Sequence, residues 1–314
     1  MKTESRILYL AGWGRSGSTL IARALGGIDG WCTVGEARRV WDFGVIRNEA
    51  CSCGAPFHDC PFWSDIFQRA FDGMDSAMAT RMVQAQSRIH TWQMAMLPRS
   101  RLLSMTSGWD GEFLSVLRRL YDAVAEVTGA RVIVDSSKIP AYGLALDAIS
   151  EGSLRVAHLV RDPRACTYSW AKRRKRQPFG VMKSVGPIGN GLQWASRNRA
   201  ITRAWGGDPD RYLLFRYEDF IADPTATLAV LAGLTGDARA RFDHVAESNV
   251  ILGPSHMAAG NPNRFSLGPT TLRLDDEWET ALPGSDRRLV EALARGQMRR
   301  YGYERGSPVS LRPT

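Results

Sequence analysis

The sequence predicts an α/β fold in which helices flank a central, mainly parallel β-sheet. Short apolar segments alternate with helix-like segments along most of the 314 residues, and strands that alternate with helices form parallel sheets through crossover connections. Hydrophobic residues make up 44% and charged residues 23% of the chain, which is typical of a globular protein. We expect one domain over residues 1–314, with a helical insertion or cap at 61–128, where strand signals are missing.

The expected strands are short apolar runs that precede polar turns. They cover residues 7–12, 31–36, 131–135, 153–162 and 211–220. Several expected helices carry capping signals: Gly26 and Gly27 end the first helix, and Pro163 begins another. The helices cover residues 18–27, 36–47, 75–128, 140–149, 162–174, 188–206, 222–234 and 285–301, and one more begins at Pro61. Residues 253–269, rich in Gly, Pro and Asn, are expected to form a long ordered loop.

The chain carries a formal net charge of +9, and most of its basic residues are arginine. Such a surplus attracts anionic ligands, although an arginine-rich composition without a functional cause explains it equally well. The basic residues are spread and no nucleic-acid recognition motif is present, so we expect no nucleic-acid partner. The N-terminal apolar run is too short for a secretory signal, and no run reaches the roughly 20 residues of a membrane span. We therefore expect a cytoplasmic protein without a membrane partner.

The stretch GWGRSGST, which follows the first expected strand, nearly matches the Walker phosphate-binding pattern. Gly12 and Gly17 have the required spacing, but Ser18 stands where that pattern has lysine. A glycine-rich turn between a strand and a helix directs backbone N–H groups at an anion. The side chains that add donors are Arg15, Ser16, Ser18 and Thr19. Because the lysine is missing, the expected ligand is phosphate-like but not a hydrolysable triphosphate; a turn without a ligand is the alternative.

A second block, LVRDPRACTYS, again joins an apolar strand to a helix. Arg161 follows the strand, and ligands of open α/β sheets gather at the carboxyl ends of strands. Ser169 lies eight residues later, about two helical turns, and is expected on the same side. Arginine and serine suit a second phosphate group. Taken alone, the block favours a helix cap whose arginines are solvated.

Together, RSGST, VDSSK, RDPRACTYS and RYEDF, in this order, resemble the sulfotransferases that use 3′-phosphoadenosine 5′-phosphosulfate (PAPS). The resemblance runs from about residue 6 to 234 and is weaker over 48–128. It implies that residues 15–19 hold the 5′-phosphosulfate and that Arg161 and Ser169 hold the 3′-phosphate. It also implies a P-loop-like fold, 3′-phosphoadenosine 5′-phosphate (PAP) as product, and no required metal. Arg15 then stands in for the lysine of the cytosolic members.

The segments VGEARRVW and VDSSKIP resemble those of protein-tyrosine sulfotransferases. The resemblance implies that Glu36 is the catalytic base, that Arg39 is a cation of the site, and that Lys138 stabilises the leaving oxygen. Ser137 is expected to contact donor or acceptor. Glu36 at a helix start, where negative charge is favourable, is the structural alternative.

Two residues of the expected loop 253–269, called the late loop below, are further candidates. His256 is the rival base, because cytosolic family members use histidine, although its sequence context differs from theirs. Arg264, in GNPNRF, is expected to contact the donor, although this loop departs from the Arg-Lys-Gly form of the cytosolic enzymes.

The segment CSCGAPFHDC gathers Cys51, Cys53, His58 and Cys60. Four such side chains are able to bind zinc, but the spacing is not that of a standard zinc finger or ribbon. A local disulfide is a second alternative. We expect instead a compact loop that packs its thiols, and no metal.

The expected reaction is sulfuryl transfer to the hydroxyl of a small molecule: a phenol, a sugar or a natural product. Protein-tyrosine sulfation is the alternative acceptor chemistry, disfavoured by the missing secretory signal. A Mg²⁺-dependent P-loop kinase is the alternative enzyme; its acidic strand end would be Asp135. Homodimers are common in the family, so a homodimer is an expectation here.

Overall fold

The computed structural model describes residues 5–87, 91–96, 111–172 and 184–303. Its centre is a five-stranded sheet in the order β2-β3-β1-β4-β5, and every neighbouring pair is parallel. The strands are β1 (Arg6–Gly12), β2 (Trp31–Gly35), β3 (Val132–Lys138), β4 (Arg155–Val160) and β5 (Tyr212–Arg216). The predicted α/β fold with a parallel sheet is confirmed.

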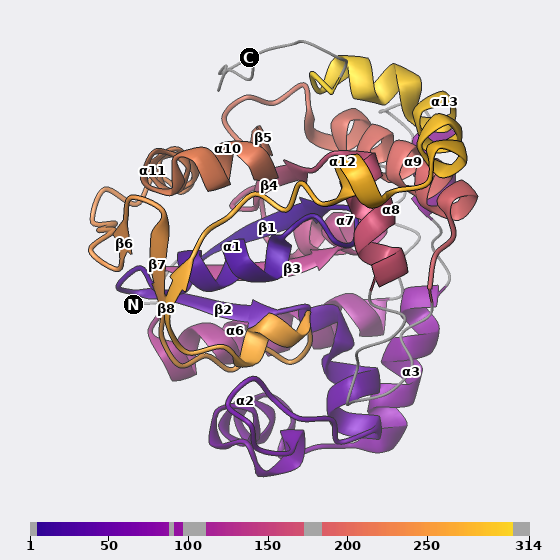
Figure 1. Cartoon of the computed structure of the whole chain (residues 1–314). Helices are drawn as coiled ribbons and strands as arrows, with labels where there is room; N and C mark the ends of the chain where they lie inside the picture. Colours follow the sequence, from indigo (N-terminus) through magenta and orange to yellow (C-terminus); the bar gives the residue numbers. More distant parts are fainter. Residues whose placement is uncertain (1–4, 88–90, 97–110, 173–183, 304–314) are drawn as a thin grey trace.

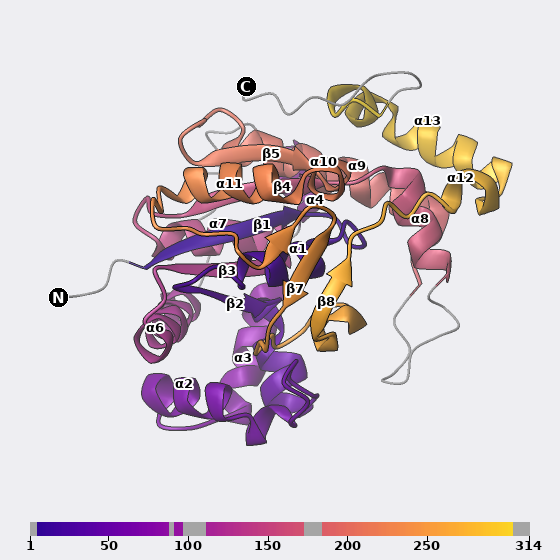
Figure 2. The same ribbon diagram turned by 60° about the vertical axis from the view of Figure 1, so that its left-hand side comes forward.

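Helices cover both faces of the sheet (Figures 1 and 2). Side chains of β1 alternate between them: Leu8 and Leu10 pack with α1 (Ser18–Leu25) and α11 (Pro224–Thr235), while Ile7 and Tyr9 face the opposite layer. That layer contains α6 (Gly111–Thr128), α7 (Pro140–Ile149) and α9 (Pro187–Trp205). Because neighbouring strand residues point to opposite faces, an apolar strand of this kind needs a helix layer on each side.

The remaining helices extend the two layers. α8 (Pro163–Lys172) and α13 (Gly284–Arg300) form a third apolar cluster around Trp194 of α9. In its described part, the segment between β2 and β3 is mainly helical; residues 88–90 and 97–110 of the predicted helical stretch 75–128 lie outside the described residues. The described part contains α2 (Pro61–Phe71), α3 (Ser76–Ser87), α4 (Thr91–Met96) and α6. No helix within the described ranges has the length and hydropathy that crossing a bilayer takes.

Several element boundaries differ from the predictions. Residues 36–47 form a 3₁₀ turn, η1 (Ala37–Arg39), and a π-helix, η2 (Val40–Ile46), instead of the predicted helix. Gly44 of η2 lies against the ring of Phe57, where a Cβ would come within 2.7 Å of the ring. The strand predicted over 211–220 ends at Arg216, where the Asp219 carboxylate accepts a hydrogen bond from the Arg216 amide and begins α10 (Tyr217–Ala222). β3 runs three residues further than predicted, to Lys138.

A second, antiparallel sheet was not predicted. It consists of β6 (Val245–Ala246), β7 (Asn249–Leu252) and β8 (Gly268–Thr271), so the predicted loop 253–269 is a connection between two paired strands. The connection contains the short helix η6 (Pro262–Phe265), and both β7 and η6 pack on α1. The strands are too short for an alternating apolar pattern to be distinguished from a loop.

His158 lies in β4 as a fully buried side chain, as expected of a core residue. Its ring nitrogens pair with the Tyr212 hydroxyl at 2.7 Å and with Asn198 Oδ1 at 2.9 Å. Burial disfavours the imidazolium form and lowers the pKa of His158 to about 4, from 6.5. The folded protein therefore holds this histidine neutral at pH values at which the unfolded chain protonates it.

We predict that His158 makes the protein lose stability as the pH falls from 6.5 towards 4. The unfolded state binds a proton in this range that the folded state does not, and the shift corresponds to about 3 kcal/mol. The check is urea unfolding of the wild type, His158→Gln and the control His244→Gln between pH 7.5 and 4. Only His158→Gln should flatten the pH dependence; three parallel curves would contradict the assignment.

Candidate active site

The candidate residues converge on one edge of the large sheet. Glu36 follows β2, the glycine-rich loop follows β1, Lys138 ends β3, and Arg161 follows β4. These four strands are adjacent and parallel, so their carboxyl ends lie side by side. Open α/β sheets bind ligands at this edge.

The loop from Gly12 to Thr19 forms a tight anion-binding turn. Gly17 has φ +88°, and a Cβ there would lie 2.3 Å from the Tyr217 ring, so the position requires glycine. Ser16 Oγ donates to the Trp13 carbonyl at 2.7 Å, which holds the turn. Ser18 and Thr19 are buried in the first turn of α1, where the Leu20 and Ile21 amides donate to the Gly17 carbonyl and the Ser18 and Thr19 amides have no acceptor within the helix. The turn therefore fits a phosphate-like group.

Arg161 and Arg15 are connected. Arg161 Nη1 donates to the Arg15 carbonyl at 3.1 Å, and the Arg161 guanidinium lies 4.6 Å from the centre of the Tyr217 ring. Arg15 adopts a left-handed conformation (φ +68°), and its guanidinium stacks on Trp170 and donates to the Asn261 side-chain oxygen. Both arginines are nearly fully buried. Two oriented cations thus stand beside the N-terminus of α1.

Glu36 and Lys138 form an ion pair. Lys138 Nζ donates to Glu36 Oε1 at 2.7 Å and to the Ser136 carbonyl at 2.8 Å. Burial opposes ionisation of Glu36, but the charge and hydrogen bond of Lys138, together with the charges of two neighbouring arginines, outweigh it, and the Glu36 pKa lies below its usual value. Lys138 has φ +65°. Left-handed backbone at a non-glycine residue costs about 1–2 kcal/mol and is concentrated at functional sites.

The segments beside the pair add positive charge. Ser137, buried in β3, accepts a hydrogen bond from the Arg38 amide through its Oγ at 3.1 Å. Arg38 and Arg39 both lower the Glu36 pKa, after Lys138. Arg39 is also paired with Asp42 at 2.5 Å and stacks on a phenylalanine ring. Arg39 and Ser137 thus lie beside the ion pair, and their roles towards donor and acceptor stay predictions.

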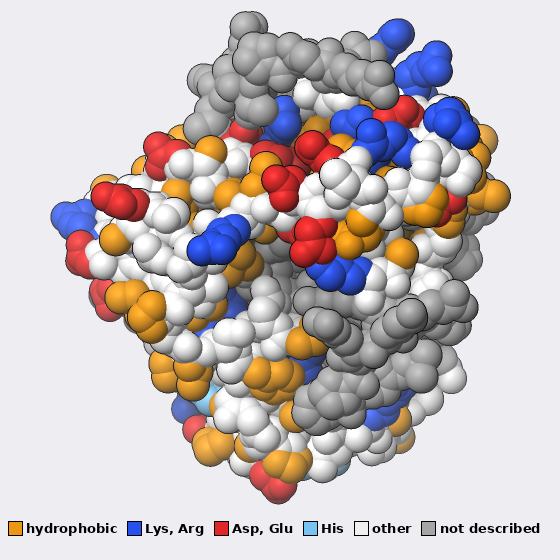
Figure 3. All heavy atoms as spheres, in the orientation of Figure 1, with side chains coloured by type: hydrophobic (Ala, Val, Ile, Leu, Met, Phe, Trp, Pro, Cys, Tyr) orange, Lys and Arg blue, Asp and Glu red, His pale blue; other side chains and the backbone are white. Residues whose placement is uncertain are grey.

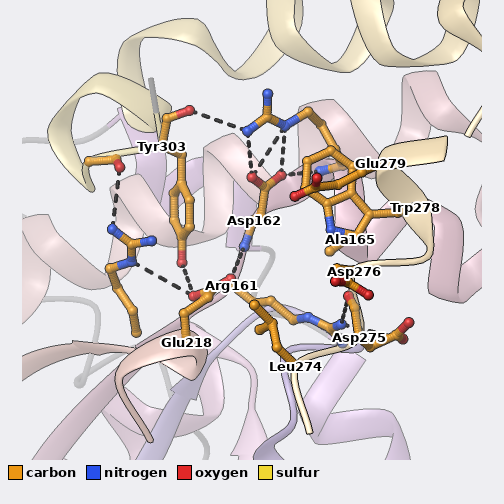
Figure 4. A pocket seen from close by; sticks show the side chains of 13 residues that line it. Arg161, Asp162, Ala165, Glu218, Leu274, Asp275, Asp276, Trp278, Glu279 and Tyr303 are labelled. Carbon is orange, nitrogen blue, oxygen red and sulfur yellow. Dashed lines mark hydrogen bonds and ion pairs between the residues drawn. The ribbon is translucent and has the colours of Figure 1, made fainter. Parts of the chain in front are cut away.

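Figure 4 shows a pocket beside Arg161. It is lined by the turn after β4, by α8, by the start of α10, by α12 (Trp278–Ala281) with the loop before it, and by the segment after α13. Arg161 Nη2 faces Asp275 of this loop at 3.5 Å. Asp162 is paired with Arg164 at 2.6 Å, so its charge is balanced within the pocket. An anion that binds Arg161 through Nη2 therefore competes with Asp275.

Ser169 and Arg264 lie at the margins of this arrangement. Ser169 is a half-buried residue of α8 that directly precedes Trp170, which stacks on Arg15. Arg264 donates to the Gly260 carbonyl at 2.7 Å and to the Ala50 carbonyl at 3.2 Å. One hydrogen bond lies within the late loop, and the other connects this loop to the segment before Cys51.

His256 and His58 differ from their predicted settings. His256 Nδ1 lies 3.3 Å from Cys60 Sγ, and its ring stacks on Phe62 with 4.8 Å between centres. His58 instead lies 2.9 Å, through Nε2, from the Val45 carbonyl. The predicted grouping of His58 with the three cysteines is wrong: His256 occupies that place.

Asp135, the acidic residue on which the kinase alternative depends, is completely buried. It accepts hydrogen bonds from the Tyr121 hydroxyl and from the Ser137 amide, the latter at 2.6 Å. Burial raises its pKa to about 6. A carboxylate held in this way orients β3 rather than a Mg²⁺ ion.

Sequence reasoning did not identify several residues of the site. Asn261 contacts Arg15, and its amide donates to Thr19 Oγ1 at 3.1 Å. The GNPNRF motif that pointed to Arg264 contains Asn261, and the block that pointed to Ser169 continues into Trp170. Asp275 carries no sequence signal, because only the fold brings it to Arg161.

On the face shown in Figure 3, the described Lys and Arg side chains lie interspersed with acidic ones. They do not form a continuous basic stripe there.

A family model described as the sulfotransferase family matches residues 8–236. The chain belongs to this family and is accordingly a transferase. A search of curated proteins gave no match.

Three solved structures are similar to this chain. The sulfotransferase domain of the Synechococcus PCC 7002 olefin synthase is 20% identical, with 93% of this chain and 94% of that chain covered and a TM-score of 0.48. A sulfotransferase domain from the curacin biosynthetic pathway is 16% identical, with 92% and 97% covered and a TM-score of 0.44. A sulfotransferase from Alicyclobacillus acidocaldarius is 13% identical, with 92% and 95% covered and a TM-score of 0.37. The family assignment rests on the family model.

We predict that Lys138→Met raises the pKa of Glu36. The substitution removes the charge and the hydrogen bond that favour the carboxylate and leaves the burial that opposes it. The check is a ¹³C NMR titration of the glutamate carboxyl groups, with the Glu36 signal assigned as the one missing from Glu36→Gln. A Glu36 titration unchanged in Lys138→Met would show that the ion pair does not form in solution.

Proposed function

We propose that this protein transfers a sulfuryl group from PAPS to a hydroxyl group of a small-molecule acceptor. The observation that carries the proposal is the 2.7 Å Lys138–Glu36 pair, adjacent on the sheet to a phosphate-type loop. A cation and a carboxylate at that position supply the two functions that in-line sulfuryl transfer needs: charge stabilisation on the leaving side and removal of the acceptor proton. Bound PAPS supplies the activated sulfuryl group.

Two phosphate-binding regions fit the donor. The turn around Gly17 and the first turn of α1 offer backbone N–H groups, serine and threonine hydroxyls, and Arg15 for the 5′ side. Arg161 suits the 3′-phosphate: its Nη1 is oriented by the Arg15 carbonyl, and its buried Nε donates to no acceptor among the described residues. We also assign Ser169 to the 3′-phosphate region, because it lies in α8 directly before Trp170, whose ring stacks on the Arg15 guanidinium. Arg264 is assigned to the late loop because its hydrogen bonds go to two backbone carbonyls.

Glu36 is the proposed base. In the resting site Lys138 holds the Glu36 carboxylate ionised and ready to accept a proton, but also makes it a weak base. When Lys138 turns towards negative charge on the leaving side, Glu36 loses that stabilisation and its affinity for a proton rises. The same lysine thus couples leaving-group stabilisation to proton removal.

The acceptor side of the site is assigned to the region around Glu36. Arg38 and Arg39 follow the base by two and three residues, and the Arg39 guanidinium carbon lies 4.4 Å from the centre of the Phe43 ring. An aromatic ring and guanidinium groups suit a phenolic or otherwise conjugated hydroxyl compound. The acceptor class we propose is accordingly a phenol, sugar or natural-product hydroxyl.

We predict that PAP binds the wild type without Mg²⁺ and that Arg161→Ala weakens this binding about 100-fold. The loss corresponds to hydrogen bonds to a charged group, each about 1.5–3 kcal/mol. Asp275→Asn should strengthen binding, because Asp275 competes with the anion for Arg161. The measurement is calorimetric titration with PAP and, separately, with ATP and Mg²⁺. Binding of ATP–Mg²⁺ but not PAP would overturn the donor assignment and favour a kinase.

We predict that Glu36→Gln lowers kcat/KM for sulfuryl transfer by about 10²–10⁴-fold and leaves PAP affinity nearly unchanged. General-base catalysis contributes a factor of this size, and the isosteric amide preserves shape. The assay follows PAP formation from PAPS with a phenol that the wild type accepts. Asp42→Asn, which changes a nearby carboxylate, is the matched control and should retain most activity. An active Glu36→Gln enzyme would exclude Glu36 as the base.

A further inference from the structure

The structure brings three cysteines and one histidine to a single point outside the candidate active site. Cys51, Cys53, Cys60 and His256 each direct one donor atom to this point, and the four atoms all lie within 4.8 Å of one another. Cys51 and Cys53 lie in one turn, and Cys60 directly precedes α2. His256 comes from the connection between β7 and β8, 196 residues after Cys60. Four potential metal-ligand atoms from distant segments thus meet at one point.

The distances match a tetrahedral metal site. With zinc–sulfur bonds of about 2.3 Å and zinc–nitrogen bonds of about 2.0–2.1 Å, tetrahedral geometry separates two sulfurs by about 3.8 Å and sulfur from nitrogen by about 3.5 Å. Cys53 Sγ lies 3.7 Å from Cys60 Sγ. His256 Nδ1 lies 3.3 Å from Cys60 Sγ and 3.9 Å from Cys51 Sγ. These three separations are close to those of a tetrahedral coordination shell, and all four donor atoms lie within 4.8 Å of one another.

The two alternatives from the sequence fit less well. A disulfide needs sulfurs about 2.05 Å apart, whereas Cys53 and Cys60 are separated by 3.7 Å, and pairing any two would leave the third thiol at the same point. Thiol packing explains buried cysteines such as Cys51 and Cys60. It does not explain Cys53, which is exposed and still turns its sulfur to the others.

We propose that Cys51, Cys53, Cys60 and His256 bind one Zn²⁺ ion. Three thiolates and an imidazole nitrogen are donors that select zinc over magnesium or calcium. Four protein donors close the tetrahedral shell, so the ion has a structural role and no position for an activated water. Cys60 precedes the first turn of α2, where the helix N-terminus stabilises a thiolate. The proposal is independent of the donor and acceptor assigned above.

The consequence of the site is to fasten the late loop to the loop before α2. Backbone contacts support the same junction: the Ser52 amide donates to the Met257 carbonyl at 3.2 Å, and the Met257 amide donates to Ser52 Oγ at 2.7 Å. Further along the late loop, the Ala259 carbonyl accepts from the Glu36 amide at 3.1 Å. The metal therefore positions a segment that also supports the base.

The test is the metal content of tag-free wild type expressed in zinc-supplemented medium, measured by mass spectrometry. We expect one zinc per chain, retained through gel filtration. Cys53→Ser and His256→Gln should lose it. Two matched controls should keep it: Cys32→Ser, a half-buried cysteine of β2, and His58→Gln, a histidine of the same segment whose ring lies outside the cluster.

X-ray absorption of the wild type keeps the test valid if a variant fails to fold. We expect three sulfur neighbours at about 2.3 Å and one nitrogen at about 2.0–2.1 Å. Removing zinc with a chelator should lower the unfolding temperature and expose the late loop to protease, both restored by added zinc. Wild type without bound metal, a disulfide between any two of the three cysteines, or zinc retained equally by Cys53→Ser and His256→Gln would overturn the proposal.

Discussion

The parallel pairing of β1 with both β3 and β4 is the constraint on which the site depends. The β1 register places Ala11 beside Lys138 and Gly12 beside Leu159, so the loop after β1 emerges between the ends of its two neighbours. A shift of one residue would turn each side chain to the other face of the sheet. The apolar layers on both faces prevent this shift. The positions of Lys138 and Arg161 relative to the loop follow from that packing.

The late connection between β7 and β8 is the second organising feature. It makes three contacts with the surrounding segments. Asn261 forms hydrogen bonds with Arg15 and Thr19, and the Ala259 carbonyl accepts one from the Glu36 amide. His256 lies in the cysteine cluster. Residues Met257, Ala258 and Ala259 of this connection are buried, but the residues on either side of them are only partly buried or exposed and need other contacts for their order. Polar contacts, and the zinc ion we propose, supply that order. One segment thereby links the phosphate loop to the base.

Local sequence signals predicted those parts of the site that one strand–turn–helix unit builds. The loop around Gly17 and the position of Arg161 follow from an apolar strand, a turn and a capped helix, all within about a dozen residues of each other. The predictions were wrong where local patterns are not specific: residues 40–46 form a π-helix, and the short strands β6 to β8 lack a recognisable period. Asp275 was missed for a related reason, because no local pattern marks an acidic residue that pairs with a distant arginine.

The sequence by itself determined the α/β class, the sulfotransferase resemblance, and the identity of the loop, arginine and glutamate candidates, because spacing within a short segment controls each of them. Only the tertiary structure decided which distant groups meet. It paired Glu36 with Lys138 across 102 residues, and it brought His256 rather than His58 to the cysteines. His58 is close to them in sequence, but its ring turns towards Val45. The contacts between distant segments depend on how helices and loops pack on the sheet, which residue spacing does not encode.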